Sequence, residues 1–371
     1  MERVALVTLG AQALVTTSLG YRLACDHEGC TGSTELFGAW LGGERPPAWT
    51  SLPSSSTGIS PGKSAVAVTL HGELLALTQG HHGYATMDPK QSPNELWLVS
   101  DSGETKTKLP SRQFTAVTMV STSDGSLVAA TGMESSWMAV AMGGAASEAV
   151  RVLAVEGERK IGDELVYRSP GSTNIQAVPR APRSPAIAAG VTRAAVTYRI
   201  DDELWVAEVD RRTGRRLTAP RRIARGEIGQ AALAFEGDEL HALFARRTRG
   251  KPYVIEHAYW GKGLAAEPTI DVIIERTDSA IAPSIAFGGG RWLVAWMEGD
   301  LSRRGRVLFG TSQASVGDAV AHAEILSPPN VNARDPKVAL TTTRGGGGWL
   351  VWGEFGGPGM SLRYAPLSSC P

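Results

Sequence analysis

The feature that most constrains the fold of this chain is an internal repeat. Segments such as PSIAFGGGRWLVAWMEG (283–299) and QAALAFEGDELHALFARR (230–247) share a run of small and apolar residues, a glycine-rich or polar turn, and a second apolar run. Short apolar runs joined by turn residues predict antiparallel β-hairpins. The same pattern recurs in residues 12–29, 64–80, 116–132, 184–201 and 336–354.

A second pattern follows the first and completes a larger unit. TELFGAW (34–40), NELWLVS (94–100) and DELWVAEV (202–209) each open with an acidic residue, leucine and an aromatic residue, and each leads through a turn into a polar segment. The unit therefore has four predicted strands and recurs about every fifty residues, a period typical of β-propeller blades. An α-helical repeat is excluded because no window keeps a 3.6-residue apolar period.

We therefore predict an all-β fold, a seven-bladed β-propeller of four-stranded antiparallel blades in a single domain spanning 1–371. The first strands begin near Gln12, Ser64, Thr115, Pro185, Ala231, Pro283 and Pro336. The predicted blades span residues 11–56, 57–112, 113–183, 184–226, 227–277, 278–330, and 331–371 together with 1–10.

The two ends of the chain predict how the ring closes. The last unit stops after its third strand, near residues 360–371, and MERVALVTLG (1–10) resembles the fourth strands of other units. An added N-terminal strand would remove the open edge of the last sheet. We therefore expect residues 1–10 to complete the seventh blade.

Charge and hydropathy exclude few partners. Lys plus Arg and Asp plus Glu both number 37, so net charge favours neither a nucleic acid nor a membrane surface, and we expect no nucleic-acid partner. No segment has the roughly 20 apolar residues of a membrane-spanning helix. Residues 3–20 resemble an export signal before Cys25, but Glu2 and Arg22 do not fit one. The poor fit to an export signal favours a cytoplasmic location, and a secreted protein or lipoprotein is the alternative.

Some motifs resemble those of a known family. RSPAIAAG (183–190) and IAPSIAFGG (281–289) resemble strand starts in sialidase-like and lectin-like bacterial propellers, and DSGET (101–105) resembles part of the Asp-box of sialidases. The match is partial, because the Asp-box has a hydroxyl residue at the position of Val99 and an aromatic residue at the position of Lys106. The resemblance implies a propeller fold and a role in binding or hydrolysing carbohydrate.

Two polar segments are candidates for a ligand site. CDHEGC (25–30) and GHHGYATMDP (80–89) are expected between the second and third strands of the first two blades, on the face where propellers usually bind ligands. The candidate ligand-binding residues are Asp26, His27, Glu28, His81, His82 and Asp88. Imidazole and carboxylate groups bind zinc, but adjacent histidines do not easily point at one ion, so we predict no metal and no cofactor.

The three cysteines allow one disulfide at most. A Cys25–Cys30 bridge across a hairpin loop is sterically reasonable, and a bridge from Cys370 to Cys30 is an alternative. Three buried free thiols would fit a cytosolic protein.

Arginine is concentrated in residues 211–225. The cluster consists of Arg211, Arg212, Arg215, Arg216, Arg221, Arg222 and Arg225. It predicts an anionic partner such as phosphate, an acidic polysaccharide or an acidic protein surface. The alternative is that charge on an outer strand discourages edge-to-edge aggregation.

Four tryptophans, Trp97, Trp205, Trp296 and Trp352, recur at equivalent positions, which indicates packing between blades.

No motif marks an enzyme. The chain has no nucleophile motif, phosphate loop or HExxH, and no motif singles out the loop carboxylates Asp26, Glu28, Asp88, Glu298, Asp300 and Glu354. We therefore predict no catalytic residues and a non-enzymatic module that presents loops on one face to a carbohydrate or protein partner. The alternative is a sialidase-like glycoside hydrolase.

Overall fold

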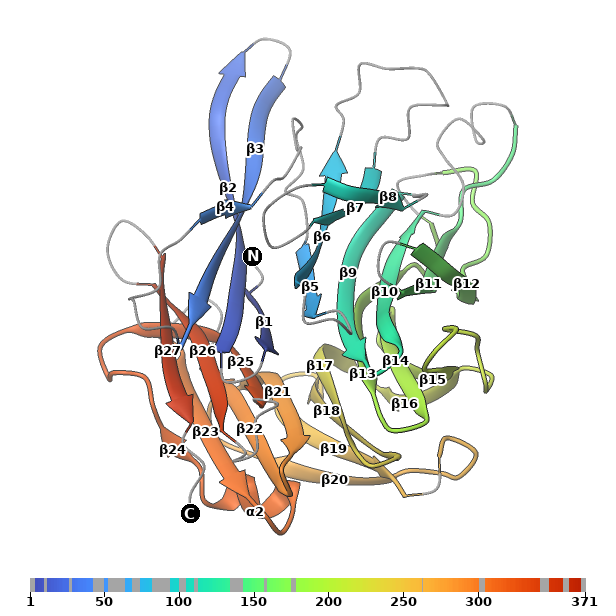
Figure 1. Cartoon of the computed structure of the whole chain (residues 1–371). Coiled ribbons are helices and arrows are strands. Elements are labelled where there is room, and N and C mark those ends of the chain that lie inside the picture. The colour runs from blue at the N-terminus through green and yellow to red at the C-terminus, as the bar shows by residue number, and fades with distance from the viewer. Residues whose placement is uncertain are drawn as a thin grey trace.

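The computed structural model of the chain consists of antiparallel β-sheets that follow one another around a ring (Figure 1). The structure describes residues 4–9, 12–26, 29–42, 50–52, 64–68, 74–81, 94–99, 105–109, 113–133, 143–156, 159–174, 178–261, 263–299, 304–340, 347–355 and 360–367.

Each sheet is a meander of consecutive strands. The first three sheets are β1 (Val4–Leu9), β2 (Gln12–Asp26), β3 (Gly29–Leu41) and β4 (Thr50–Leu52); β5 (Ser64–Val68), β6 (Leu74–His81), β7 (Asn94–Val99) and β8 (Thr105–Leu109); and β9 (Gln113–Thr122), β10 (Gly125–Met133), β11 (Glu148–Glu156) and β12 (Arg159–Arg168).

The next two sheets are β13 (Pro182–Ala189), β14 (Arg193–Ile200), β15 (Glu203–Asp210) and β16 (Arg221–Arg225), and then β17 (Glu227–Glu236), β18 (Glu239–Arg247), β19 (Val254–Trp260) and β20 (Thr269–Ile274). The last two are β21 (Ala280–Gly288), β22 (Arg291–Glu298), β23 (Arg306–Ser312) and β24 (Glu324–Ile325), with the short helix α2 (Val316–Ala321) before β24, and β25 (Asn332–Leu340), β26 (Gly348–Phe355) and β27 (Met360–Leu367).

The all-β propeller with four-stranded antiparallel blades is confirmed, but the predicted blade count is wrong. The described strands form six complete four-stranded blades rather than seven, and β25–β27 form a sheet of three. The predicted closure is also wrong, because β1 does not extend the last sheet. It pairs with β2, from Val4 opposite Thr17 to Leu9 opposite Gln12, and so begins the first sheet.

The error arises from the N-terminal hairpin. The repeat pattern of residues 12–29 predicts a turn at Gly20 between two short strands, but β2 continues through it, with Gly20 opposite Thr34 of β3. The chain instead turns after Leu9 and again after Asp26. The 15-residue strand β2 covers both strands predicted within residues 12–29, and Val4–Leu9 supplies the first strand of this sheet.

The ring closes by packing of side chains rather than by strand addition. Val4, Val15 and Leu41 of the first sheet share a buried cluster with Trp349 and Val351 of the last sheet. The hydroxyl of Thr8 also donates a hydrogen bond to the carbonyl oxygen of Leu340 at 2.5 Å. Figure 1 shows the consequence, with the red strands of the C-terminus beside the blue strands of the N-terminus.

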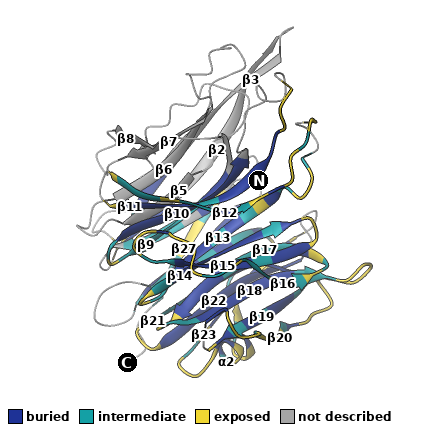
Figure 2. Ribbon diagram, turned by 90° about the vertical axis from the view of Figure 1, so that its right-hand side faces the viewer, coloured by how far each residue is buried: buried dark blue, intermediate teal, exposed yellow. Residues whose placement is uncertain are grey.

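Neighbouring sheets bury their faces against each other. One cluster joins β9–β12 to β13–β16, a second joins β13–β16 to β17–β20, and a third joins β17–β20 to β21–β24. Figure 2 shows this burial as dark blue along the middle of the strands. Trp292 and Trp296 are among the largest fully buried side chains, which agrees with tryptophan as packing material, whereas Trp205 is only half-buried.

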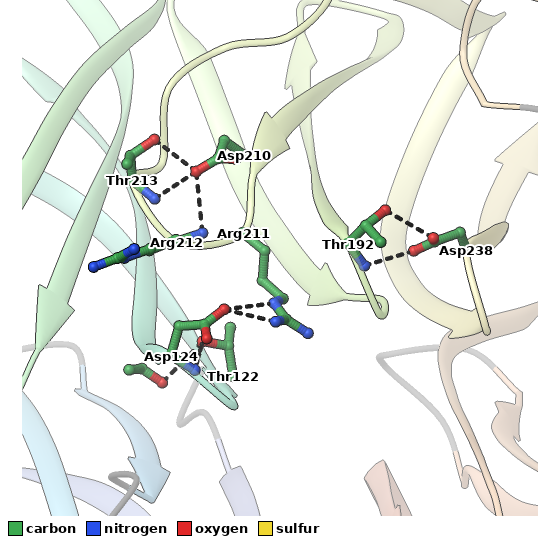
Figure 3. A network of polar contacts seen from close by, with 9 residues as sticks. Thr122, Asp124, Thr192, Asp210, Arg211, Arg212, Thr213 and Asp238 are labelled. Atoms are coloured by element: carbon green, nitrogen blue, oxygen red, sulfur yellow. Dashed lines mark hydrogen bonds and ion pairs between the residues drawn. The ribbon is translucent and has the colours of Figure 1, made fainter.

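Polar contacts connect the tight turns of neighbouring sheets (Figure 3). Asp238 accepts hydrogen bonds from the backbone nitrogen and the hydroxyl of Thr192, at 2.8 and 2.7 Å. Arg211 forms an ion pair of 2.6 Å with Asp124, which joins the turn after β15 to the turn after β9. These contacts hold turns of adjacent sheets together at one end of the ring.

No helix in the described part of the chain has the length and hydropathy needed to cross a membrane.

The packing between the first and last sheets predicts a stability defect. Leu41 is 1% exposed and lies in the closing cluster, so Leu41→Ala should lower the free energy of unfolding by about 2–5 kcal/mol, measured by urea denaturation. Leu217→Ala is the matched control, because Leu217 is 47% exposed. Equal stability of the two variants would contradict closure by this cluster.

Candidate ligand-binding face and central cavity

The first strands of five sheets begin with an irregularity at the same place. Their pairing with the second strand shifts register near Thr115, between Arg183 and Ala186, between Ile228 and Ala231, between Ile281 and Ser284, and between Arg334 and Lys337. Such β-bulges re-aim side chains and are common beside functional sites. We call this end of the ring the bulge face, and the opposite end, which carries the turns of Asp124, Thr192 and Asp238, the turn face.

Three of these bulges contain a strained residue directly before a proline. Ser184, Ala282 and Asp335 have φ of 50°, 53° and 56°, and each precedes a proline. The left-handed region is unfavourable for non-glycine residues, and proline disfavours helical conformations in the residue before it. Strain of this kind persists only where the surrounding structure enforces it, and it is concentrated at functional sites.

The bulges surround a central cavity of about 270 Å³, which is lined by first strands of six sheets. This volume lies just below the range of about 300–1,000 Å³ that is common for small-molecule sites. The polar lining residues are Thr118, Ser184, Gln230, Ser284, Asp335 and Lys337. Hydroxyl, amide and charged groups therefore converge on a small space between apolar residues such as Val4 and Leu233.

The charges in the cavity are balanced. Asp335 is the one carboxylate among the described lining residues, and its Oδ1 lies 3.3 Å from the Nζ of Lys337. The hydroxyl of Ser284 already accepts one hydrogen bond, from the backbone nitrogen of Val338 at 3.1 Å. The cavity thus offers one ion pair and several neutral hydrogen-bonding groups.

Buried glutamates recur near the bulge face. Each has an arginine partner: Glu148 with Arg183, Glu203 with Arg222 and Arg225, Glu256 with Arg246, Glu298 with Arg306, and Glu354 with Arg363. A buried charge is tolerated only when it is paired and hydrogen-bonded.

Three of these glutamates also accept a hydrogen bond from a tryptophan. The indole Nε1 of Trp296 lies 3.3 Å from Glu298, and that of Trp352 lies 3.1 Å from Glu354, two residues later on the same strand. Glu203 precedes its tryptophan instead. The Nε1 of Trp205, two residues later on the strand, donates a hydrogen bond to Glu203 at 3.2 Å. Both oxygens of these carboxylates are therefore occupied, which gives them a structural role.

Two of these carboxyl groups have opposite pKa shifts. Burial would raise the pKa of Glu203, but hydrogen bonds from Arg225, Arg222 and Trp205 outweigh it and lower that pKa to about 2. Burial raises the pKa of Glu148, and its ion pair with Arg183 only partly opposes this. Among the described carboxyl groups of the bulge face, Glu148 is the one whose pKa is raised.

The predicted loop residues are only partly described. Asp26 ends β2 opposite Gly29, and Cys25 lies directly opposite Cys30, while His81 ends β6 opposite Asn94. These positions put Asp26 and His81 at the ends of the second strands of two sheets. His27, Glu28, His82, Asp88, Asp300 and Cys370 lie outside the described residues. The convergence of the loop residues and the disulfide remain predictions.

The predicted arginine cluster divides between the two ends of the ring. Arg211, Arg212, Arg215 and Arg216 lie in the turn between β15 and β16, at the turn face, and Arg221, Arg222 and Arg225 lie on β16. Carboxylates of this chain pair with four of the seven, namely Arg211, Arg221, Arg222 and Arg225. Arg216 donates to the carbonyl oxygen of Val166 at 3.1 Å.

Sequence reasoning did not identify the cavity residues Gln230, Asp335 and Lys337 as candidates. A signal was present, because a residue followed by proline recurs at the start of several predicted first strands. It also missed one cluster of potential metal ligands. Within the described residues, the one group of three such side chains close to each other is Glu236, Glu239 and His241, on the turn face.

The comparisons with known proteins support the fold. No protein-family profile matches the chain, and no curated protein matches it in sequence. Hydrazine synthase of Kuenenia stuttgartiensis aligns with 98% of this chain and 95% of its own, with a TM-score of 0.53 and 8% identity. The GH93 α-L-arabinofuranosidase of Fusarium graminearum, in complex with arabinobiose, aligns with 82% of this chain and 92% of its own, with a TM-score of 0.51 and 11% identity.

A sialidase of Trypanosoma rangeli aligns with 86% of this chain and 54% of its own, with a TM-score of 0.49 and 12% identity. At identities this low, structural similarity shows the fold alone. The alignment with the GH93 α-L-arabinofuranosidase shows that this chain is similar in fold to that enzyme.

The lowered pKa of Glu203 predicts a pH-dependent contribution to stability. Because the folded-state pKa is about 2 and the usual value is 4.5, the contribution is complete above pH 4.5 and is lost as pH falls toward 2. Glu203→Gln should therefore have a lower melting temperature than wild type at pH 6, and the difference should shrink between pH 4.5 and pH 2. Glu275→Gln, at an exposed glutamate, is the matched control. A difference that does not change with pH would contradict the assignment.

Proposed function

We propose that this chain is a non-enzymatic β-propeller module that binds a carbohydrate or protein partner on its bulge face, with the central cavity as the anchoring pocket. The observation that carries the proposal is how the carboxylates of this face are used. Asp335, the one carboxylate among the described cavity residues, is paired with Lys337, and the buried glutamates described above are held by arginines.

Most glycoside hydrolases make a demand on carboxyl groups that can be compared with the described residues of this face, whereas sialidases, which use a tyrosine nucleophile, are an exception. Hydrolases of most families use two carboxyl groups about 5–9.5 Å apart, one of which acts as an acid and the other as a nucleophile or base. The former candidates Glu298 and Glu354 are 2% and 4% exposed, and each is bound by a tryptophan and an arginine. Binding needs no such pair, and the hydroxyl, amide and charged groups of the cavity suit a polar ligand.

Residues at the ends of two second strands, together with those that follow them in the sequence, extend the proposed binding surface. Asp26 and His81 end the second strands of neighbouring sheets, and His27, Glu28, His82 and Asp88 follow them in the sequence. We propose that these residues contact the part of the ligand that lies outside the cavity.

One observation favours the alternative, a sialidase-like glycoside hydrolase. A general acid needs a raised pKa, and burial raises the pKa of Glu148 on the bulge face. Glu148 is therefore the residue to test if turnover is found.

A glycan array combined with a panel of fluorogenic glycosides tests the proposal. We expect binding of at least one glycan without hydrolysis of any glycoside. Lys337→Ala should weaken binding about tenfold or more, because it removes the cavity ammonium group, whereas Lys251→Ala, on an exposed turn, should not. Turnover that is abolished in Glu148→Gln would replace the binding module with the hydrolase. Binding that is insensitive to Lys337→Ala would contradict the role of the cavity.

The arginine-rich turn predicts a second, anionic partner. Since Arg211 and Arg216 have partners within the chain, we propose that Arg212 and Arg215 carry most of this binding. The double variant Arg212→Glu/Arg215→Glu should elute from heparin resin at lower salt than wild type. Arg159→Glu/Arg304→Glu is a control with the same change of charge at exposed positions elsewhere. Equal elution of the two double variants would argue against the patch.

A further inference from the structure

Three potential metal ligands meet at the tight turn between β17 and β18. Glu236 and Glu239 are paired across this turn, and His241 follows Glu239 by two residues, on the same side of the strand. One carboxylate oxygen from each glutamate and one ring nitrogen of His241 all lie within 4.8 Å of one another. The cluster lies on the turn face, away from the cavity.

His241 has an unsatisfied nitrogen. The residue is 7% exposed and lies against Trp292, with 4.3 Å between ring centroids, and against Tyr259. Its Nδ1 lies 3.0 Å from Nε2 of His257, whereas its buried Nε2 has no hydrogen-bond partner in the described structure. Leaving a buried polar atom unpaired costs about 1–3 kcal/mol, so such an atom calls for an explanation.

The surroundings hold these groups in the way that metal ligands are usually held. The hydroxyl of Tyr259 donates a hydrogen bond to Oε2 of Glu239 at 2.8 Å, which orients that carboxylate. If Nδ1 of His241 donates its proton to His257, the lone pair of Nε2 is available for a cation. Metal-bound histidines commonly donate their second ring N–H in this way, and metal-bound carboxylates are themselves hydrogen-bonded.

We propose that Glu236, Glu239 and His241 bind a divalent first-row transition-metal ion, of which Zn²⁺ is the representative. A single imidazole with two carboxylates suits such an ion better than Ca²⁺, which takes six to eight oxygen ligands.

The geometry requires only a small adjustment. Ligand atoms around one Zn²⁺, at about 2.1 Å from the ion, are about 3.4 Å apart in a tetrahedral site, which is closer than the 4.8 Å limit of this cluster. Glu236 is exposed and free to rotate toward the ion, and solvent can complete the coordination. Since Trp292 belongs to the next sheet, an ion bound here would brace β17–β20 beside β21–β24.

Titration of EDTA-treated protein with Zn²⁺ tests the proposal, by calorimetry and by thermal unfolding. We expect one ion per chain and a melting temperature that rises with Zn²⁺ concentration. Glu236→Gln and Glu239→Gln should each weaken binding tenfold or more, and His257→Gln should weaken it 10- to 100-fold. Glu275→Gln is the matched control and should bind as wild type.

A direct readout avoids reliance on folding of the variants. In the ¹⁵N NMR spectrum of wild-type protein, the Nε2 resonance of His241 should shift on addition of Zn²⁺, whereas that of exposed His322 should not. Absence of binding at 100-micromolar Zn²⁺, roughly the upper limit for a specific site, would overturn the proposal. Binding that is unchanged in both Glu→Gln variants would overturn it too, since the ion would then lie elsewhere.

Discussion

The structure depends on the burial of each sheet face against the face of the next sheet. A four-stranded meander has two faces, and an isolated meander would leave apolar side chains in water on both. The ring removes this exposure for successive sheets, and contact between the first and last sheets removes it at the junction of the two ends. The cluster of Val15, Leu41 and Val351 is therefore as important to the ring as any cluster between sheets consecutive in the sequence.

The requirement for buried faces also explains the buried glutamates. At the ends of the strands the chain passes from the buried interior to solvent. Long side chains at these positions lie partly between neighbouring sheets. A glutamate in this position is stable because an arginine and a tryptophan satisfy both of its oxygens, as in Glu298 with Arg306 and Trp296. The same contacts occupy both carboxylate oxygens of Glu298, and this occupancy is the basis for proposing a binding role for the bulge face.

The four-strand repeat was predictable because turn-forming residues and apolar strand residues follow one another in the same short stretch of sequence. The turn between β21 and β22 is an example, since Gly289 and Gly290 both adopt positive φ between two apolar strands. The N-terminal sheet was assigned wrongly because Gly20 has the same local appearance as a turn glycine. Only its partner across the sheet, Thr34, shows that the strand continues. Strand order there is decided by long-range pairing, which local patterns do not contain.

The cavity and the metal-ligand cluster were hidden from the sequence for different reasons. The cavity combines two to four residues from each of six sheets, so apart from the proline near the start of several first strands, residues such as Gln230 and Lys337 share no local pattern. The cluster is local in Glu236, Glu239 and His241, but His257, which orients the ring, comes from β19.

The two sites also lie at opposite ends of the same sheets, with different demands on the backbone. The bulge face holds strained residues such as Ser184 and Asp335, which only a rigid ring can maintain. Contacts at the turn face, such as those of Asp238 with Thr192, connect neighbouring sheets at the far end of the strands, and the proposed ion beside His241 would add to them. An ion on the turn face would thus favour ligand binding by keeping the cavity in shape, without touching the ligand.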